Sequence, residues 1–311
     1  MQPASNLLKR PALRYYGGGW TRAKWTLGFI PKSHNTWVDL CVGAGSISVL
    51  KDPVPMEIVN DKDDRTVNFL RQLRDNENRL IELIHLTPWA EAEMRYCLNV
   101  SSDPLEDARR FFAMCWMTVH GGPNGDRASF RYQKSIDGRF TPPAFDAINR
   151  NDLFVFSARI KSWHIFSRDA IELIKKYGDN PDAALYFDPP YLQEKRARKQ
   201  GYTHEVSPGW HRLAAYWLRQ TKGYVVVAGY RSRLYERIYE AYGWQRVERE
   251  QKTNGKATAT ECLWLSPNTQ AALRREAAPL LEPCELPIFP NGLPDNGWPY
   301  KEGIHYTRKR K

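Results

Sequence analysis

One stretch of the sequence places an acid, two prolines and an aromatic residue in direct succession, Asp188-Pro189-Pro190-Tyr191, after the apolar run 183–187. Such a run predicts a buried parallel strand, and open α/β sheets place reactive groups at the carboxyl ends of their strands. The carboxylate and the first proline carbonyl can each accept one N–H bond of an amino group, and the aromatic ring can stack on a base. The four residues are therefore candidate catalytic residues for methyl transfer to an amino group conjugated with a ring. A turn that ends the strand is the alternative.

A glycine turn provides a second candidate site. Residues 38–41 predict a strand that leads into Gly43-Ala44-Gly45-Ser46, and an apolar pattern from residue 47 predicts a helix. Glycines in such a turn let a ligand approach the backbone closely. Because no Lys-Ser/Thr pair follows them, the turn fits a nucleoside such as S-adenosylmethionine better than a triphosphate. An ordinary strand-to-helix turn is the alternative.

Two acidic residues end neighbouring predicted strands. Asp61 follows the strand 57–60, where a carboxylate can accept both hydroxyls of a ribose. Asp169 follows the strand 163–166 and could meet an adenine amino group, or else cap the helix predicted over 170–177.

The N-terminal cluster Arg14-Tyr15-Tyr16-Gly17-Gly18-Gly19-Trp20 combines a flexible backbone with aromatic walls. Such a cluster could line a ligand site. A turn-forming N-terminal arm is the alternative.

The order of elements predicts an α/β fold with a parallel, Rossmann-like sheet, because strands and helices alternate along most of the chain. Further predicted elements are the strands 183–187 and 224–228, a helix that follows Asp61 and runs through Arg74, helices over 211–220 and 232–242, and a closing hairpin of 245–249 with 261–265. Residues 86–160 interrupt the alternation with a helical run, 111–118, and a polar, basic segment. The predicted division is 1–85 and 161–267 for two parts of a catalytic domain, 86–160 for a mainly helical recognition insert, and 268–311 for a proline-rich basic tail.

The composition describes a basic protein with a full core. Of its 311 residues, 42% are hydrophobic, which suffices for one large domain or two coupled ones. The formal net charge of +11 favours a polyanionic partner, because Lys and Arg replace condensed counterions on phosphate backbones, although solubility alone is the alternative. No stretch has membrane-spanning length and the N-terminus lacks a secretory pattern, so a cytoplasmic protein is expected. Five cysteines without Cys-x-x-Cys spacing argue against a zinc ribbon and a disulfide framework.

Taken in order, these motifs resemble the Dam-type (group alpha) DNA adenine-N6 methyltransferases, particularly their prophage-encoded branch. The likeness covers most of the chain, almost to residue 267, and also rests on the segments 13–19, 201–205, 229–230 and 260–265. It implies a site-specific enzyme that transfers a methyl group from S-adenosylmethionine to the exocyclic amino group of adenine in double-stranded DNA. The base would flip out of the stack, at a cost of a few kcal/mol. No metal is implied, since the sulfonium already carries an activated methyl group.

The resemblance also implies roles for single residues. Asp188 and Pro189 would bind the target amine, and Tyr191 would stack on the extruded base; Pro190, the fourth residue of the motif, would stiffen the loop. The donor-binding candidates are Tyr15, Tyr16, Gly17, Gly18, Gly43, Gly45, Ser46, Asp61, Asp169 and Asp188. The insert would read the DNA, and the candidates for DNA contacts are Arg14, Asn124, Arg127, Arg131, Tyr132, Lys134 and Arg139.

The sequence departs from the family pattern at a few positions. The family commonly has a lysine where Gly19 stands, which makes Lys24 and Trp20 candidates for its replacement. Leu40-Cys41 stands where Pro-Phe is usual and Ala44 where glycine is frequent, changes that the retained Gly43 and Gly45 make tolerable.

Two alternative functions stay open at this point. Methylation of the cytosine amino group has similar geometry, although Asp rather than Ser at position 188 leans towards adenine. A basic nucleic-acid-binding protein of the same fold without turnover belongs to a different class. For each of these functions the expected partner is double-stranded DNA, with association to the nucleoid. The expected oligomeric state is a monomer or a homodimer. The enzyme would act beside a restriction enzyme or as an orphan methylase.

Overall fold

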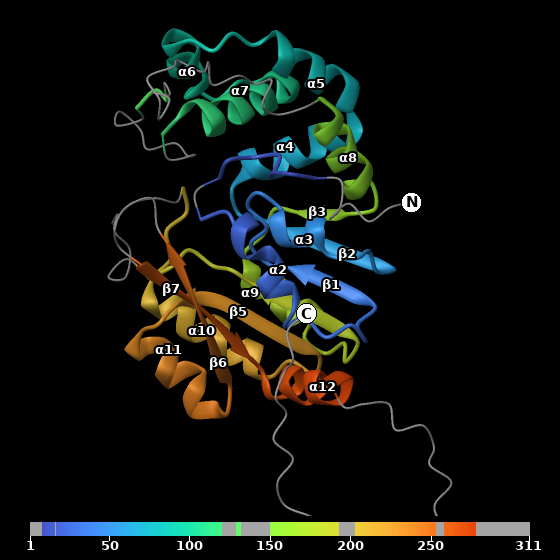
Figure 1. The fold of residues 1–311 in the computed structure, drawn as a ribbon, viewed down its shortest axis with the longest axis vertical. Coiled ribbons are helices and arrows are strands. Elements are labelled where there is room, and N and C mark those ends of the chain that lie inside the picture. Colours follow the sequence, from blue (N-terminus) through green and yellow to red (C-terminus); the bar gives the residue numbers. More distant parts are fainter. Residues whose placement is uncertain are drawn as a thin grey trace, which may run out of the picture. The chain divides into compact units, whose positions relative to one another are not determined.

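The computed structural model describes residues 8–15, 17–119, 129–131, 150–192, 203–252 and 258–277. The chain divides into two compact units, residues 1–276 and 277–311. Of the second unit only Ala277 lies within the described part of the chain, so the fold below is that of the first unit (Figure 1).

A sheet of seven strands forms the centre of the first unit, in the order β3-β2-β1-β4-β5-β7-β6. The strands are β1 (Thr36–Asp39), β2 (Met56–Asn60), β3 (His164–Phe166), β4 (Ala183–Phe187), β5 (Tyr224–Tyr230), β6 (Gln245–Lys252) and β7 (Thr258–Leu265). Five strands pair in parallel, and in the central register Val38 lies beside Ile58 and Leu185. Strand β7 runs antiparallel to both β5 and β6. The fold is thus a mixed α/β, Rossmann-like one, as the alternation of elements predicts.

The helices follow the same alternation. The structure has η1 (Trp20–Arg22), α2 (Ala23–Leu27), α3 (Ser46–Leu50), α4 (Asp64–Asp75), α5 (Glu77–Leu86), α6 (Glu91–Cys97), α7 (Pro104–Met117), α8 (Arg150–Ile160), α9 (Ala170–Tyr177), α10 (Pro208–Arg219), α11 (Arg233–Ile238), η5 (Glu240–Tyr242) and α12 (Pro267–Ala277), where η marks a 3₁₀ helix. Several begin at a side-chain cap: Asp63 caps α4, Asp103 caps α7 and Ser207 caps α10.

Helices cover both faces of the sheet, which explains why β4 is apolar throughout. Successive side chains of a strand point to opposite faces. Leu185 and Phe187 therefore pack with residues of α9, α10 and α11, whereas Ala184 and Tyr186 pack with residues of α2 and α3. Since both faces are buried, the strand needs no polar side chains.

A helical group made of α4 to α8 forms a second core. Helix α7 lies at its centre: every residue from Asp107 to Met117 is buried, the pattern of a helix surrounded by other elements. Val67, Phe69, Leu70 and Leu73 form the buried side of α4, as their spacing predicts. In Figure 1 α5, α6 and α7 lie beyond α4, away from the sheet.

The structure differs from the sequence analysis in several details. Helix α7 begins at Pro104, seven residues before the predicted run 111–118, and strands β6 and β7 are longer than the predicted hairpin. Strand β1 begins and ends two residues earlier than predicted, at Thr36 and Asp39. The helix predicted over 232–242 is split at Tyr239, whose φ of −121° and ψ of −62° lie outside the helical region. Residues 267–277, which the sequence analysis assigned mostly to the tail, form α12, whose Thr269 and Ala272 are buried. The predicted domain division itself stays a prediction.

Candidate active site

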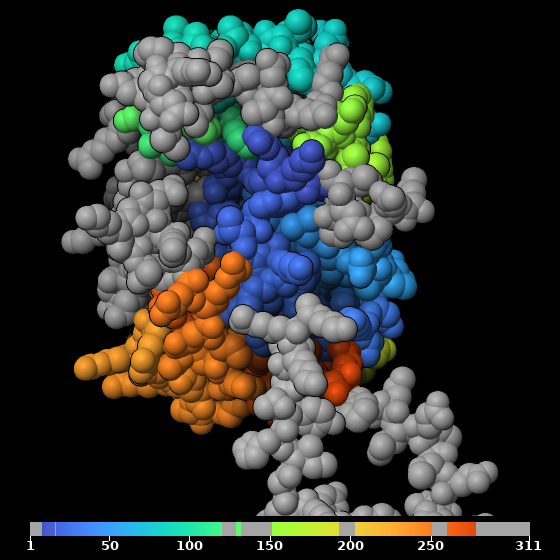
Figure 2. Space-filling model, viewed as in Figure 1, coloured from blue at the N-terminus to red at the C-terminus, as the bar shows by residue number. Residues whose placement is uncertain are grey.

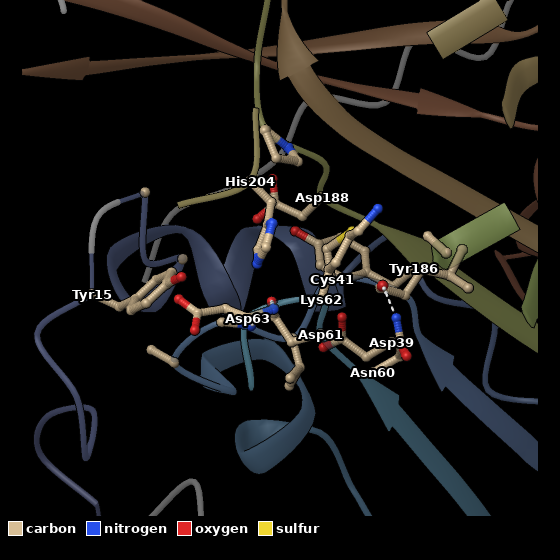
Figure 3. Close-up of a pocket in the computed structure, with 18 of the residues that line it drawn as sticks. Tyr15, Asp39, Cys41, Asn60, Asp61, Lys62, Asp63, Tyr186, Asp188 and His204 are labelled. Carbon is tan, nitrogen blue, oxygen red and sulfur yellow. Dashed lines mark hydrogen bonds between the residues drawn. The ribbon is translucent and has the colours of Figure 1, made fainter. Parts of the chain in front are cut away.

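The chemical residues predicted from sequence meet at one edge of the sheet. Strands β1, β2, β3 and β4 are parallel neighbours, so the residues that follow them lie together at their carboxyl ends. There they line a cavity with about 920 Å³ of empty space, counted to its open mouth. Figure 3 shows Asp39, Asp61, Asp63 and Asp188 around it, with Tyr15 and Tyr186 at opposite sides of the view. The predicted residues that line it are Tyr15, Gly17, Gly18, Gly43, Ser46, Asp61, Asp169, Asp188 and Pro190.

The glycine turn is shaped by two residues in the left-handed region. Gly43 has φ of +48° and Gly45 has φ of +68°, which favour glycine at both positions. A side chain at Gly43 would also lie 3.2 Å from Cδ1 of Tyr15, so the Tyr15 ring rests directly on the turn. Gly45 does not line the cavity; it faces Trp163, and its contribution is to the path of the backbone.

Asp61 connects the ends of β1 and β2. Its carboxylate accepts the backbone N–H of Gly43 over 2.8 Å and that of Asp63 over 2.9 Å. Each carboxylate oxygen has two lone pairs, so acceptor capacity remains for hydroxyl groups of a ligand. Burial raises the pKa of Asp61 to about 6, although the two N–H bonds oppose this rise.

Asp39 lines the cavity and was not among the predicted site residues. Its Oδ2 accepts the hydroxyl of Ser48 over 2.6 Å, while Oδ1 is buried and has no hydrogen-bond partner within the described ranges. Burial raises the pKa of Asp39 to about 7. An unsatisfied buried acceptor beside a cavity fits a cationic ligand group. The sequence shows Asp39 only as one polar residue of a predicted strand and does not indicate a role in the site.

Asp188 forms a buried ion pair that local sequence patterns do not reveal. The guanidinium of Arg22 contacts Oδ2 of Asp188, and its other terminal nitrogen bonds Oε1 of Glu261 at 3.2 Å. Burial raises the pKa of Asp188, and the charge of Arg22 opposes this rise. Neither Lys24 nor Trp20 lines the cavity, and Lys24 is exposed. Arg22 is therefore the cation of this N-terminal segment that meets Asp188.

The remaining residues of the catalytic motif have different surroundings. Pro190 lines the cavity, whereas Pro189 is buried and does not. Tyr191 is 7% exposed, and its ring meets that of Tyr230 edge-on at a centroid distance of 4.8 Å. In this structure, stacking on a base would require the Tyr191 ring to become more exposed.

Asp169 lies at the cavity but its carboxylate is already engaged. It caps α9 through the backbone N–H of Ile171, at 3.0 Å, which is the alternative that the sequence analysis left open. It also accepts the indole N–H of Trp210 at 3.1 Å, and Trp210 lines the same cavity. Trp210, which was not among the predicted site residues, therefore lines the cavity beside Asp169.

The segment after the catalytic motif reaches across the cavity. Thr203, His204 and Val206 line it, and the hydroxyl of Thr203 donates to Oδ2 of Asp63 at 3.0 Å. Because Asp63 also caps α4, this bond joins the segment to the start of that helix.

The predicted DNA contacts are described only in part. Arg14 donates to the carbonyls of Thr118 and Val119, at 2.8 and 2.7 Å, beyond the end of α7. The backbone of Arg131 pairs with that of Met117 at 2.7 Å. The predicted site residues outside the described ranges are Tyr16, Asn124, Arg127, Tyr132, Lys134 and Arg139.

Two general searches concern metals and membranes. Across the described residues, no group of three or more His, Cys, Asp or Glu side chains is placed to hold a metal ion. In the same part of the chain, no helix combines the length and apolar character needed to cross a membrane.

Comparison with known proteins identifies related sequences. A family model described as D12 class N6 adenine-specific DNA methyltransferase matches residues 15–253. The chain is also 24% identical, over 270 residues, to the Type II methyltransferase M1.LlaDCHI of Lactococcus lactis subsp. cremoris. That match covers 81% of this chain and 91% of the Lactococcus protein.

Proposed function

The chain belongs to the D12 class N6 adenine-specific DNA methyltransferases, and we propose that its cavity binds S-adenosylmethionine beside a flipped adenine of duplex DNA. The observation behind this proposal is that Asp188, at the end of β4, lines the same cavity as the glycine turn and Asp61. A donor and a target amine that are bound there would meet without any movement of the strands. Since the family is adenine-specific, adenine and not cytosine is the expected target.

The cavity has the features that the methyl donor needs. The absence of a side chain at Gly43 lets the Tyr15 ring pack directly on the turn, and both residues line the cavity as one wall for the donor. Asp61 retains lone pairs for the two ribose hydroxyls. The unpartnered Oδ1 of Asp39 offers an acceptor to the ammonium group of the methionine part. S-adenosylmethionine supplies a methyl group that its sulfonium has already activated.

Asp188 prepares the target amine for attack. The amino nitrogen of adenine is a poor nucleophile because its lone pair is delocalised into the ring. When the carboxylate of Asp188 and the carbonyl of Pro189 each accept one N–H, the nitrogen is held in place and its pyramidal, attacking geometry is favoured. The ionised carboxylate is the better acceptor, so the charge state of Asp188 matters for the reaction.

The adenine must leave the base stack before Asp188 can reach it. Unstacking costs a few kcal/mol, which contacts to phosphates and to the vacated site must offset. Tyr191 is proposed to stack on the flipped base after its ring separates from Tyr230. The insert between residues 86 and 160 is proposed to read the sequence, with its basic residues on phosphates or base edges.

Replacement of Asp188 by asparagine tests this function. The amide would keep the size of the side chain but lose its charge, and we expect single-turnover methylation of DNA to fall by about 10²–10³-fold. Asp179→Asn is the matched control, because the Asp179 side chain is 84% exposed, where it pairs with Lys222. An Asp188→Asn enzyme that keeps wild-type turnover would remove the proposed role. A wild-type protein that binds the donor tightly but methylates no DNA would favour the silent binding protein instead.

A further inference from the structure

The cation beside Asp188 comes from a distant part of the sequence. Arg22 ends η1 and is only 3% exposed, and its guanidinium bridges Asp188 and Glu261. Glu261 lies on β7, opposite Tyr230 of β5. We propose that Arg22 is a positioning residue for methyl transfer, which keeps the Asp188 carboxylate ionised and fixed while Glu261 fixes Arg22. This inference rests on the role proposed above for Asp188.

The charges around Asp188 explain why a cation is needed. Asp39 of β1 and Glu261 of β7 are acidic, Cys41 follows β1, and the phenols of Tyr186 and Tyr191 are uncharged at neutral pH. Burial and the acidic neighbours both favour a protonated carboxyl. Among the ion pairs of the described ranges, Arg22 is the partner of Asp188. Hydrogen bonds with Tyr191 and Tyr186 also lower the pKa of Asp188, but the charge of Arg22 opposes burial most strongly, so its loss would raise this pKa further.

The bridge also holds the carboxylate in one place. A guanidinium presents its N–H groups in a planar fork, so two acceptors at two of its nitrogens determine its orientation. The Nε of Arg22 has no partner within the described residues, which leaves the two carboxylates to orient the group. Glu261, itself 9% exposed, thereby acts on Asp188 through Arg22.

Gly19 makes room for this guanidinium. A Cβ atom at Gly19 would lie 3.3 Å from Nε of Arg22 and 3.4 Å from one terminal nitrogen. The φ of Gly19 is −84°, a value that any residue adopts, so the space and not the backbone favours glycine here. A side chain at position 19 and the guanidinium of Arg22 thus compete for one place, beside Asp188.

The first experiment compares Arg22→Met, Arg22→Lys and Glu261→Gln by kcat between pH 5.5 and 9, with donor and DNA saturating. We expect Arg22→Met to lower kcat at pH 7 at least tenfold and to move the acid limb of the profile at least one pH unit upwards. Glu261→Gln should cause a smaller decrease, and Arg22→Lys should keep the limb near its original position. The control is Arg249→Met, which removes a charge from the neighbouring strand β6, where Arg249 bonds the carbonyl of Thr21.

Several outcomes would overturn the inference. The inference is wrong if Arg22→Met keeps a kcat within twofold of the wild type, or if its acid limb does not move. It is also wrong if Arg249→Met has the same effect as Arg22→Met. If Arg22→Met fails to fold, the neutral but polar Arg22→Gln is measured instead: it too should move the acid limb upwards, whereas a purely structural role predicts no shift. Loss of activity in Asp188→Asn with a normal Arg22→Met would refute this inference alone. Full activity of Asp188→Asn would refute the proposed function as well.

A second experiment uses the competition between positions 19 and 22. Gly19→Lys alone should lower kcat, because the new side chain crowds and repels the guanidinium. Arg22→Ala alone should lower it through loss of the cation. The double variant Gly19→Lys/Arg22→Ala should recover at least tenfold over Arg22→Ala, because an ammonium from position 19 can enter the vacated space. If the kcat of the double variant does not exceed that of the less active single variant, the proposed pairing of positions 19 and 22 is wrong.

Discussion

The carboxylate of Asp61 accepts the backbone N–H of Gly43 at 2.8 Å. The residue that ends β2 therefore holds the turn that follows β1. A ligand bound between them meets two walls that are already joined, so little ordering is needed on binding. This relationship makes the effects of changes at Asp61 and Gly43 specific enough to predict.

Asp61→Asn should weaken donor binding about tenfold or more, while DNA affinity stays unchanged. An amide offers fewer acceptor sites, and the loss of one hydrogen bond to a charged group costs about 1.5–3 kcal/mol. Calorimetry with S-adenosylmethionine measures the effect. Asp64→Asn is the control, since Asp64 is exposed and does not line the cavity. Equal donor affinity in the two variants would refute the assignment of Asp61 to the ribose.

Donor binding should weaken as the pH falls. The pKa of Asp61 is raised to about 6 and that of Asp39 to about 7, so both are mainly ionised at pH 8 and mainly protonated at pH 5. If the ionised forms bind the donor, its Kd rises through this window, and each group contributes roughly tenfold per pH unit below its pKa. Titrations at four pH values from 5 to 8 measure the slope, which Asp61→Asn should reduce. A constant Kd would contradict both roles.

Asp39→Asn should stabilise the fold and weaken the donor site. The folded pKa of Asp39, about 7, lies above its ordinary value of 3.8, so the folded state binds the proton more tightly and loses stability as pH rises between those values. A shift of about three units corresponds to at most about 4 kcal/mol. The variant should therefore have a higher Tm than the wild type at pH 8, with a smaller advantage at pH 5. A Tm difference that is independent of pH would speak against a charged Asp39.

Gly43→Ala and Gly243→Ala separate backbone strain from loss of the donor site. Both glycines have positive φ, +48° and +78°, so each substitution should cost about 1–2 kcal/mol of stability. A Cβ at Gly43 would meet the ring of Tyr15 at 3.2 Å, whereas one at Gly243 would meet nothing within 4 Å. Only Gly43→Ala should therefore reduce donor affinity, at least tenfold. Similar donor affinities in both variants would place the donor elsewhere.

Arg14→Met should lower stability rather than alter the salt dependence of DNA binding. Its guanidinium holds the carbonyls of Thr118 and Val119, and hydrogen bonds from charged groups are worth about 1.5–3 kcal/mol each. A phosphate contact would instead reduce the slope of log K against log salt by about 1. Lys9→Met, at an exposed position in the same segment, controls for lost charge. A reduced slope with an unchanged Tm would restore the DNA contact that the sequence analysis expected.

Local patterns predicted most of the fold because the signals are contiguous. Helix α9 begins and ends at the predicted residues, since Asp169 caps it and its apolar residues lie on one side. Strand β4 was likewise predicted from end to end by its apolar run. The carboxyl ends of the strands also indicated where the chemistry lies.

The missed parts of the site depend on long-range contacts. Arg22 reaches Asp188 across 166 residues and Glu261 across 239, and no local pattern encodes such a pair. Asp39 was missed for a related reason, because its place at the cavity, with Oδ1 buried and unpartnered within the described residues, shows only when the surrounding elements are assembled. Helix α12 was missed because prolines are frequent in the sequence after it, so that residues 268–277 were assigned to the proline-rich tail.

The bridge from Arg22 to Glu261 has a consequence for protein synthesis. Figure 2 shows the residues near Arg22, in blue, between the teal and green helices and the orange strands and helices. The ion pair joins the blue segment, through Arg22, to Glu261 of β7. Arg22 emerges from the ribosome before Glu261, which emerges only with β7, the strand that lies between β5 and β6. A nascent or prematurely terminated chain that ends before β7 therefore lacks one end of the bridge. The bridge therefore forms only after β7 has been translated.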